Sequence, residues 1–305
     1  RKSSPKIRPW HNDVIVKSQQ ACIRVDKPQK IRLKEIETKP LFKVEREKAE
    51  AETLKLGQEM EELFDQLFFA GTHSLLIILQ GMDAAGKDGS IRHLLRHTHA
   101  QSCRVASFKV PTPEELAHDF LWRCHQQTPR RGQIVIFNRS HYEDVGVVRV
   151  HSLVPEEVWS RRYDRINEFE SLLAENRTII LKFFLHVSPE EQEERLRERE
   201  EDPDAAWKLN VGDWKERAHW DAYQEAYGDA ISKCAAEHAP WFIVPADKKW
   251  YRNLAMTQAV VDALTNLDSL RAKAHVVDAL PKATSETPTI VASPPAPLAA
   301  SSASP

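Results

Sequence analysis

Residues 75–91 read Leu75-Leu76-Ile77-Ile78-Leu79-Gln80-Gly81-Met82-Asp83-Ala84-Ala85-Gly86-Lys87-Asp88-Gly89-Ser90-Ile91. An apolar run ends in a loop framed by glycines, and the loop opens into a helix-forming segment. Gly81, Gly86 and Lys87 have the spacing G-x-x-x-x-G-K, which between a buried strand and a helix is typical of a phosphate-binding loop. Backbone N–H groups of such a loop surround phosphate oxygens, and the lysine reaches the outer phosphates. The stretch therefore predicts phosphate binding on an α/β domain.

Two acidic residues distinguish this loop. Asp88 stands where Ser or Thr usually follows the lysine, and Asp83 lies inside the loop. Because Mg²⁺ prefers carboxylate and water oxygens, Asp83 is a candidate metal ligand, with a loop-stabilising Asx turn as the alternative. Asp88 either helps to hold the metal through water or caps the helix. The loop residues expected to bind phosphate or nucleotide are Gly81, Met82, Ala84, Ala85, Gly86, Asp88 and Gly89.

Composition narrows the class of protein. The chain has 305 residues, which allows roughly one or two domains of ~100–200 residues. Its 43 Lys and Arg against 45 Asp and Glu give a net charge of −2, so a polyanion must bind at a local patch and no nucleic-acid partner is expected. Four scattered cysteines without a C-x-x-C pair indicate a reduced, cytoplasmic chain. No apolar run approaches the ~18 residues that span a membrane, so no membrane partner is expected.

Apolar runs of strand length alternate with segments of helical period, which predicts an α/β fold with a mostly parallel sheet. Strands are expected at residues 74–79, 104–110, 134–137, 179–187 and 241–245. Helices are expected at 44–69, 86 to about 97, from 112, 155 to about 176, from 188, and 250 to about 270. Capping boxes with Pro at the first helical position begin two of these helices, at Thr112 and Ser188.

Both ends of the chain differ from the middle. Residues 1–40 are basic and form an N-terminal arm, which is either a solvated tail or a clamp on the folded domain or on a neighbouring subunit. Residues 41–271 form the phosphate-binding domain. Residues 272–305 are rich in Ala, Pro and Ser, and we expect this tail to be disordered because it lacks the apolar content to pack.

A second motif, residues 136–144, begins where the third expected strand ends. Ligands of open α/β sheets bind beyond the carboxyl ends of the strands, where the Gly81 loop also lies. Related sites often have a metal-holding Asp here, and this chain has Asn138. Arg139 has the geometry for a bidentate contact with a phosphoryl group, and pairing with Glu143 is the alternative. Glu143 and Asp144 are further metal candidates, acting through water.

Residues 189–220 form a third, highly charged segment, with Asp202-Pro203 interrupting it. Spacings of four residues between Glu191 and Arg195 and between Glu193 and Arg197 fit a solvated helix face. We favour an arginine-bearing lid, because a phosphoryl-transfer site needs both shielding from water and charge neutralisation. Trp207, Trp214 and Trp220 are expected to pack within it rather than to stack on a base.

These motifs together resemble polyphosphate kinase family 2. The resemblance covers roughly residues 31–270, including Ser107-Phe108-Lys109-Val110-Pro111-Thr112-Pro113, Lys182-Phe183-Phe184-Leu185-His186-Val187-Ser188 and Pro245-Ala246-Asp247. It implies a P-loop kinase fold similar to thymidylate kinase, in which helices enclose a parallel sheet and a helical lid covers the site. The motif Asn138-Arg139-Ser140-His141-Tyr142-Glu143-Asp144 resembles the class III branch, which acts on nucleoside mono- and diphosphates. Gly146 stands where the family pattern favours a larger apolar residue.

The resemblance also implies roles for individual residues. It assigns catalysis to Asp83, Lys87, Arg139 and Arg195. Further candidates for phosphate or nucleotide binding are Asn138 and, from the charged segment, Arg199 and Lys208. Because Asn138 removes one carboxylate, the metal is expected to depend on Asp83 and water.

The implied activity is phosphoryl transfer between inorganic polyphosphate and purine nucleotides, AMP and ADP or GMP and GDP. The implied cofactor is Mg²⁺, with Mn²⁺ as a substitute, and the implied assembly is a homo-oligomer, a dimer or tetramer. Two alternatives stay open at this point: an ATP-dependent nucleoside monophosphate kinase, and a sensor that binds phosphate without turnover. The reaction direction, the base and the preferred acceptor are not determined by sequence.

Overall fold

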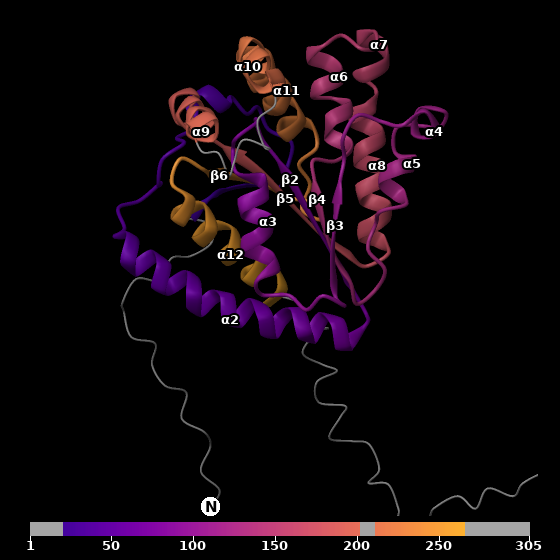
Figure 1. The fold of residues 1–305 in the computed structure, drawn as a ribbon. Coiled ribbons are helices and arrows are strands. Elements are labelled where there is room, and N and C mark those ends of the chain that lie inside the picture. The colour runs from indigo at the N-terminus through magenta and orange to yellow at the C-terminus, as the bar shows by residue number, and fades with distance from the viewer. Residues whose placement is uncertain (1–20, 202–210, 266–305) are drawn as a thin grey trace, which may run out of the picture.

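The computed structural model describes residues 21–201 and 211–265. These residues form a six-stranded sheet of order β1-β6-β5-β2-β4-β3 (Figure 1). Five strands run parallel, and β1 pairs with β6 in the antiparallel direction. The strands are β1 Ile23–Val25, β2 Ser74–Gln80, β3 Cys103–Ser107, β4 Ile134–Asn138, β5 Thr178–His186 and β6 Trp241–Pro245.

Helices cover both faces of the sheet. On one face α12 packs along α2 and against α3 (Figure 1). On the other, Lys182 and Phe184, which share a face of β5, contact Glu170 of α8 and Tyr227 of α11. The helices are α2 Arg46–Ala70, α3 Lys87–Leu95, α4 Pro113–Leu116, α5 Trp122–His125, α6 Val147–Val150, α7 Glu156–Trp159, α8 Arg162–Glu175, α9 Pro189–Glu201, α10 Val211–Glu216, α11 Trp220–Lys233 and α12 Lys249–Thr265, with 3-10 turns η1 Leu33–Glu35, η2 His141–Asp144 and η4 Arg217–His219.

β2 is the centre of the core. All seven of its residues are buried, as expected of a parallel strand covered on both faces. It hydrogen-bonds to β4 on one side and β5 on the other, and its Leu79 lies opposite Asn138. This register brings the loop after β2 and the motif after β4 to neighbouring positions at the carboxyl edge of the sheet.

The sequence analysis predicted the parallel α/β fold and five strands, and these are confirmed. It missed β1, a strand of only three residues within a basic segment. The second strand was predicted to reach Val110 but ends at Ser107, and Val110 is exposed. The helix beginning at Thr112 has the expected capping box but ends at Leu116, and the Asp119 carboxylate accepts the Leu121 N–H before α5 begins.

One predicted long helix is two. Residues 155–176 form α7 and α8, separated by a turn at Ser160 and Arg161. The two helices contact different elements, α7 lying against α6 and α8 against β5, and one straight helix would not reach both.

Part of the N-terminal arm contacts the domain. The Ile31 N–H donates to the Ser232 hydroxyl over 2.9 Å, and the Thr38 hydroxyl donates to Asp247 over 2.8 Å. Ala21, Cys22, Val25 and Leu33 are buried in the core. Of the two interpretations of the arm, the clamp on the folded domain therefore describes residues 21–38. Residues 1–20, the segment with Trp207 and Lys208, and the tail after Thr265 lie outside the described residues. None of the described helices is long and apolar enough to cross a membrane.

Candidate active site

The loop after β2 has a strained backbone that places it close to β5. Gly81 has φ +149° and Gly86 has φ +106°, and Ala84 between them has φ +60°. A Cβ at Gly81 would lie 2.8 Å from the Leu185 carbonyl oxygen, so no larger residue fits there. The structure therefore requires a glycine at position 81, the first glycine of the G-x-x-x-x-G-K spacing.

Lys87 lies over the loop that precedes it. Its Nζ donates to the carbonyl oxygens of Gly81 and Met82 at 2.7 and 3.0 Å. Burial, and after it the charge of Arg139, lower the pKa of the ammonium to about 8 against the opposing effect of nearby carboxylates. A phosphate group would supply the negative charge that these neutral carbonyls lack.

Arg139 joins the two motifs. Its Nη2 donates to Asp83 Oδ1 over 2.6 Å, and its Nη1 donates to Glu143 Oε2 over 3.1 Å. Burial would lower its pKa, but the Glu143 and Asp83 carboxylates raise it above the ordinary value, so the guanidinium is fully charged. The Arg139–Glu143 pair, which the sequence offered as the alternative to phosphate binding, is present. Arg139 also pairs with Asp83 of the loop.

A buried polar cluster supports the turn that carries Arg139. Lys182 Nζ lies 2.5 Å from Glu170 Oε2 and 3.0 Å from the Tyr142 hydroxyl, which donates to Glu170 Oε1 over 2.9 Å. His141 Nε2 lies 3.2 Å from the same oxygen. Opposing the effect of burial, Lys182 and His141 hold the pKa of Glu170 below its usual value. The sequence analysis missed this cluster, although a lysine inside an apolar strand was a usable signal.

Arg195 of α9 connects the charged segment to the loop. It is buried and donates to the carbonyl oxygens of Ala84, Ala85, Ala246 and Asp247 at 2.6–3.1 Å. Its Nε donates to Glu191 over 2.9 Å, and the predicted Glu193–Arg197 pair is also confirmed, at 2.7 Å.

Other contacts from the same segment reach the loop and fix the helices to one another. Gln192 donates to the Asp83 carbonyl oxygen over 2.8 Å. Trp214 lies under the Arg217 guanidinium and donates to Glu200, so it packs within the segment as expected.

Asn138 and Asp88 face each other. The Asn138 amide donates to Asp88 Oδ1 over 3.1 Å. No side chain caps the start of α3, so the contact of Asp88 with Asn138 replaces the capping role considered from the sequence. An aspartate at position 138 would put two carboxylates against each other, and the amide removes that repulsion.

A large basic cavity lies beside the loop. Its volume is about 810 Å³, and nine Lys or Arg side chains line it against three carboxylates. Lys87, Arg139, Arg195 and Arg199 from the sequence analysis are among these cations. The analysis missed Arg92, Arg96, Lys109, Lys249 and Arg252. Arg92 of α3 and Arg96, which directly follows that helix, are four residues apart and could have been found as one basic face. The α12 residues reach the loop only through the fold.

Asp83 and Arg139 also line a second, small cavity of about 20 Å³. Its other walls include Glu216, Tyr223 and Tyr227. The Tyr223 hydroxyl donates to Glu216 over 2.7 Å. The two cavities therefore meet at the Asp83–Arg139 pair.

Asp144 and Gly146 have structural contacts. The Asp144 carboxylate lies 2.8 Å from Arg162 Nη1 and 3.7 Å from Arg123 Nη2, and it lines neither cavity. Burial raises its pKa to about 6 despite these two arginines. A Cβ at Gly146 would lie 3.1 Å from the Tyr142 carbonyl oxygen, so a larger residue there would require the turn to shift by a few tenths of an ångström.

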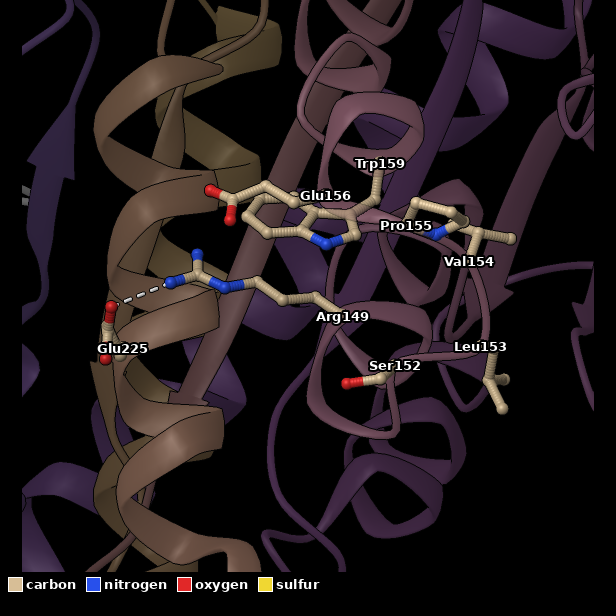
Figure 2. A pocket seen from close by; sticks show the side chains of 8 residues that line it. All are labelled: Arg149, Ser152, Leu153, Val154, Pro155, Glu156, Trp159 and Glu225. Carbon is tan, nitrogen blue, oxygen red and sulfur yellow. Dashed lines mark hydrogen bonds and ion pairs between the residues drawn. The ribbon is translucent and has the colours of Figure 1, made fainter.

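Another pocket, of about 670 Å³, lies between α6, α7 and α11 (Figure 2). Its one cation is Arg149, which stacks over Trp159 and pairs with Glu225 at 2.8 Å and Asp229 at 2.7 Å. Two carboxylates already neutralise this guanidinium, so the pocket is poorly suited to a phosphate group.

Comparisons with known proteins agree on one family. A family model described as polyphosphate kinase 2 matches residues 43–272. The chain is 52% identical over 212 residues to the AMP/ADP-polyphosphate phosphotransferase of Meiothermus ruber, covering 70% of this chain and 79% of that one. It is 41% identical over 222 residues to the ADP-polyphosphate phosphotransferase of Rhodopseudomonas palustris, covering 69% and 77%. The crystal structure of polyphosphate kinase 2 from Arthrobacter aurescens TC1 superposes with a TM-score of 0.76 at 38% identity, covering 83% and 95%.

Proposed function

The chain belongs to the polyphosphate kinase 2 family, and we propose that it transfers phosphoryl groups between inorganic polyphosphate and the nucleotides AMP and ADP. One observation carries the proposal: two cavities meet at Asp83 and Arg139, and the larger is lined by nine cations. The names of relatives that are 52% and 41% identical support these substrates. Guanine nucleotides are included as acceptors, since no described contact selects the base.

The lining of the large cavity favours polyphosphate over ATP as the donor. Among the described residues that line it, there is no Phe, Tyr or Trp on which an adenine could stack. The cations continue from the loop along α3, through Arg92 and Arg96. A chain of phosphates matches a groove of this charge, whereas a nucleoside triphosphate would place its base among arginines and lysines.

The residues around the smaller cavity form the proposed acceptor side. The cavity itself, at about 20 Å³, holds about one water molecule, so a nucleotide would bind against these residues rather than inside it. There Tyr223 and Tyr227 offer ring surface next to Arg139, and Glu216 connects this side to the lid. An acceptor phosphate oxygen attacks the terminal phosphorus of polyphosphate in line. The new P–O bond forms while the bond to the bridging oxygen breaks, which leaves the donor one phosphate shorter.

The chain's own residues act by positioning and by charge. Lys87 and Arg139 neutralise the transferred phosphoryl group, and the backbone N–H groups of the loop orient it. Arg195 holds the loop carbonyls in place. For Arg139, the phosphoryl group competes with the carboxylates of Asp83 and Glu143, so substrate binding changes the pairing of this guanidinium.

The residues present are compatible with Mg²⁺, and Mn²⁺ is the proposed substitute. Among the described residues no group of three or more His, Cys, Asp or Glu side chains forms a closed metal site. Mg²⁺ often binds through one or two carboxylates, water and substrate phosphates, and Asp83 and Asp88 both face the large cavity. When bound, the ion would offset phosphate charge and orient the donor. Asp144 is not a proposed metal ligand, because its carboxylate lines neither cavity.

The test is a matrix of donors and acceptors, run in both directions. Polyphosphate, Mg²⁺ and AMP or ADP, without ATP, should yield ADP or ATP. Near-full activity of the Lys87→Ala variant would refute the assignment of the loop. Turnover with ATP and a nucleoside monophosphate but none with polyphosphate would identify a nucleotide kinase, and binding without turnover for every pair would identify a sensor. Light scattering on the same sample would test the expected dimer or tetramer.

A further inference from the structure

Arg252, in the first turn of α12, is a buried cation beside the phosphate loop. Only 4% of its surface is exposed. Its Nη1 donates to the Gly86 carbonyl oxygen over 3.2 Å, and its Nη2 donates to Asn253 Oδ1 over 2.9 Å. Both acceptors are neutral, and none of the ion pairs between described residues includes Arg252. Its charge is therefore buried without a carboxylate partner in the described part of the chain.

The surroundings of Arg252 add to the unfavourable charge. Burial lowers its pKa to about 10, and the neighbouring Arg195 contributes in the same direction. The guanidinium also lies at the N-terminal end of α3, where the unpaired N–H groups carry positive potential. Removing one partner of a buried ion pair destabilises a protein strongly, and here the structure has no acidic partner in place. An anion in the cavity would add an attraction to Arg252 that offsets these unfavourable interactions.

Two glycines leave space for this side chain. A Cβ at Gly86 would lie 2.2 Å from Arg252 Nη1, and a Cβ at Gly89 would lie 3.2 Å from Nη2. Gly86 is also required by its φ of +106°, but Gly89 has no such backbone requirement. A Cβ at position 89 would therefore need the guanidinium to move by a few tenths of an ångström, so the glycine two positions after the phosphate-binding lysine fits the observed position of Arg252.

Arg195 shows what a structural arginine looks like in the same place. It also lies beneath the loop, but its Nε donates to Glu191 over 2.9 Å and its other donors fill four carbonyl oxygens. Both arginines line the basic cavity, but Arg252 makes fewer contacts and has no carboxylate partner among the described residues. The contrast separates an arginine that holds the loop from one that has charge to offer to a ligand.

We propose that Arg252 is a substrate-binding residue that contacts the phosphate chain of the donor at the start of α3, and that Gly89 is small to admit its guanidinium. This inference rests on the proposed function, because it assigns the ligand of Arg252 to polyphosphate. It is specific to the donor, since Arg252 lines the large cavity and not the small one.

The test compares the wild-type protein with Arg252→Met, which keeps the length of the side chain and removes its charge. We expect the KM for polyphosphate to rise about tenfold or more, as for loss of a charge-assisted contact, while the KM for the nucleotide changes less than about twofold. Without ligands, the melting temperature should stay equal or rise, because an uncompensated buried charge is gone. The increase in melting temperature that polyphosphate alone gives the wild type should shrink.

Two control variants give these results meaning. Arg252→Lys keeps a positive charge and should fall between wild type and Arg252→Met in its KM for polyphosphate. Arg149→Met removes an arginine that Glu225 and Asp229 neutralise, so it should lower the melting temperature and leave the KM for polyphosphate unchanged.

Three results would overturn the inference. They are a wild-type KM for polyphosphate in Arg252→Met, a raised KM for the nucleotide instead, and a loss of folding stability like that of Arg149→Met. A wild-type protein that neither binds nor consumes polyphosphate would instead refute the proposed function. The wild-type measurement therefore distinguishes failure of the function from failure of the role given to Arg252.

Discussion

Lys182 and Glu170 give the sharpest prediction about stability. Both side chains are at most 1% exposed, and their charged atoms lie 2.5 Å apart. Removing one partner of such a buried pair typically costs about 3–5 kcal/mol, whereas replacing both by neutral groups of similar volume is nearly neutral or stabilising. We therefore expect Lys182→Met to lower the free energy of unfolding by about 4 kcal/mol. The double variant Lys182→Met with Glu170→Gln should recover most of that loss.

The pH dependence supplies an independent check. In the wild type the pKa of Glu170 is held below its unfolded value, so this carboxylate contributes stability above the unfolded pKa, and the contribution is lost as pH falls through the folded pKa. Without Lys182, burial raises the pKa of Glu170 and favours its neutral form. The deficit of Lys182→Met should therefore shrink between pH 8 and pH 5.

Urea denaturation of the three proteins at both pH values measures these quantities, with an unchanged m value as the control for similar folded and unfolded states. A loss below about 1 kcal/mol in Lys182→Met, which is the range of an exposed pair, would refute the reasoning. So would a double variant as unstable as the single one. Two members of the buried cluster, His141 and Tyr142, lie in the chain between Arg139 and Glu143. Turnover of the variants, measured well below their melting temperatures, therefore also tests whether the cluster positions Arg139.

Three further predictions concern the site. Because the pKa of Lys87 is about 8 and its charged form exists below that value, the KM for polyphosphate should rise as pH increases through 8, and Lys87→Ala should lose this dependence. Asp83→Asn should raise the Mg²⁺ concentration for half-maximal activity at least about tenfold. Asp144→Asn should leave that concentration unchanged and lower the free energy of unfolding by about 1–3 kcal/mol. Equal metal titrations of the two variants would contradict the placement of the two acids. Asn138→Asp puts a second carboxylate about 3 Å from Asp88, so it should lower the melting temperature without Mg²⁺ and recover it with Mg²⁺; no difference between the two conditions would argue against a shared ion.

The sequence predicted what depends on local signals. The buried strand predicted at 74–79 and observed at Ser74–Gln80, the glycine spacing and the Thr112 capping box are each determined within a few residues, and the structure agrees with all three. The i,i+4 pairs of α9 belong to the same class. Contacts between residues far apart in the sequence could not be predicted from these local signals. Arg252 reaches Gly86 across 166 positions of sequence, and neither residue gives a local indication of the other.

Short or interrupted elements were the other source of error. β1 has three residues and depends on pairing with β6, because so few residues carry no period of their own. The break between α7 and α8 follows from two packing partners, which a continuous helical pattern does not reveal. In both cases tertiary contacts decided a boundary that propensity left open.

The two departures from the usual motifs are best understood as one. Asp88 replaces a hydroxyl residue, Asn138 replaces a carboxylate, and their side chains meet at 3.1 Å. The pair carries one negative charge in this arrangement, as it would with a hydroxyl at position 88 and an aspartate at position 138. Compared with the usual motifs, the carboxylate stands in the first turn of α3 instead of at the end of β4, and the positive end of the helix favours it there. Considered separately, these two substitutions are the features of the sequence that favour a site that binds without turnover. Considered together, they keep the charge at the edge of the phosphate cavity, so they give no support to a non-catalytic sensor.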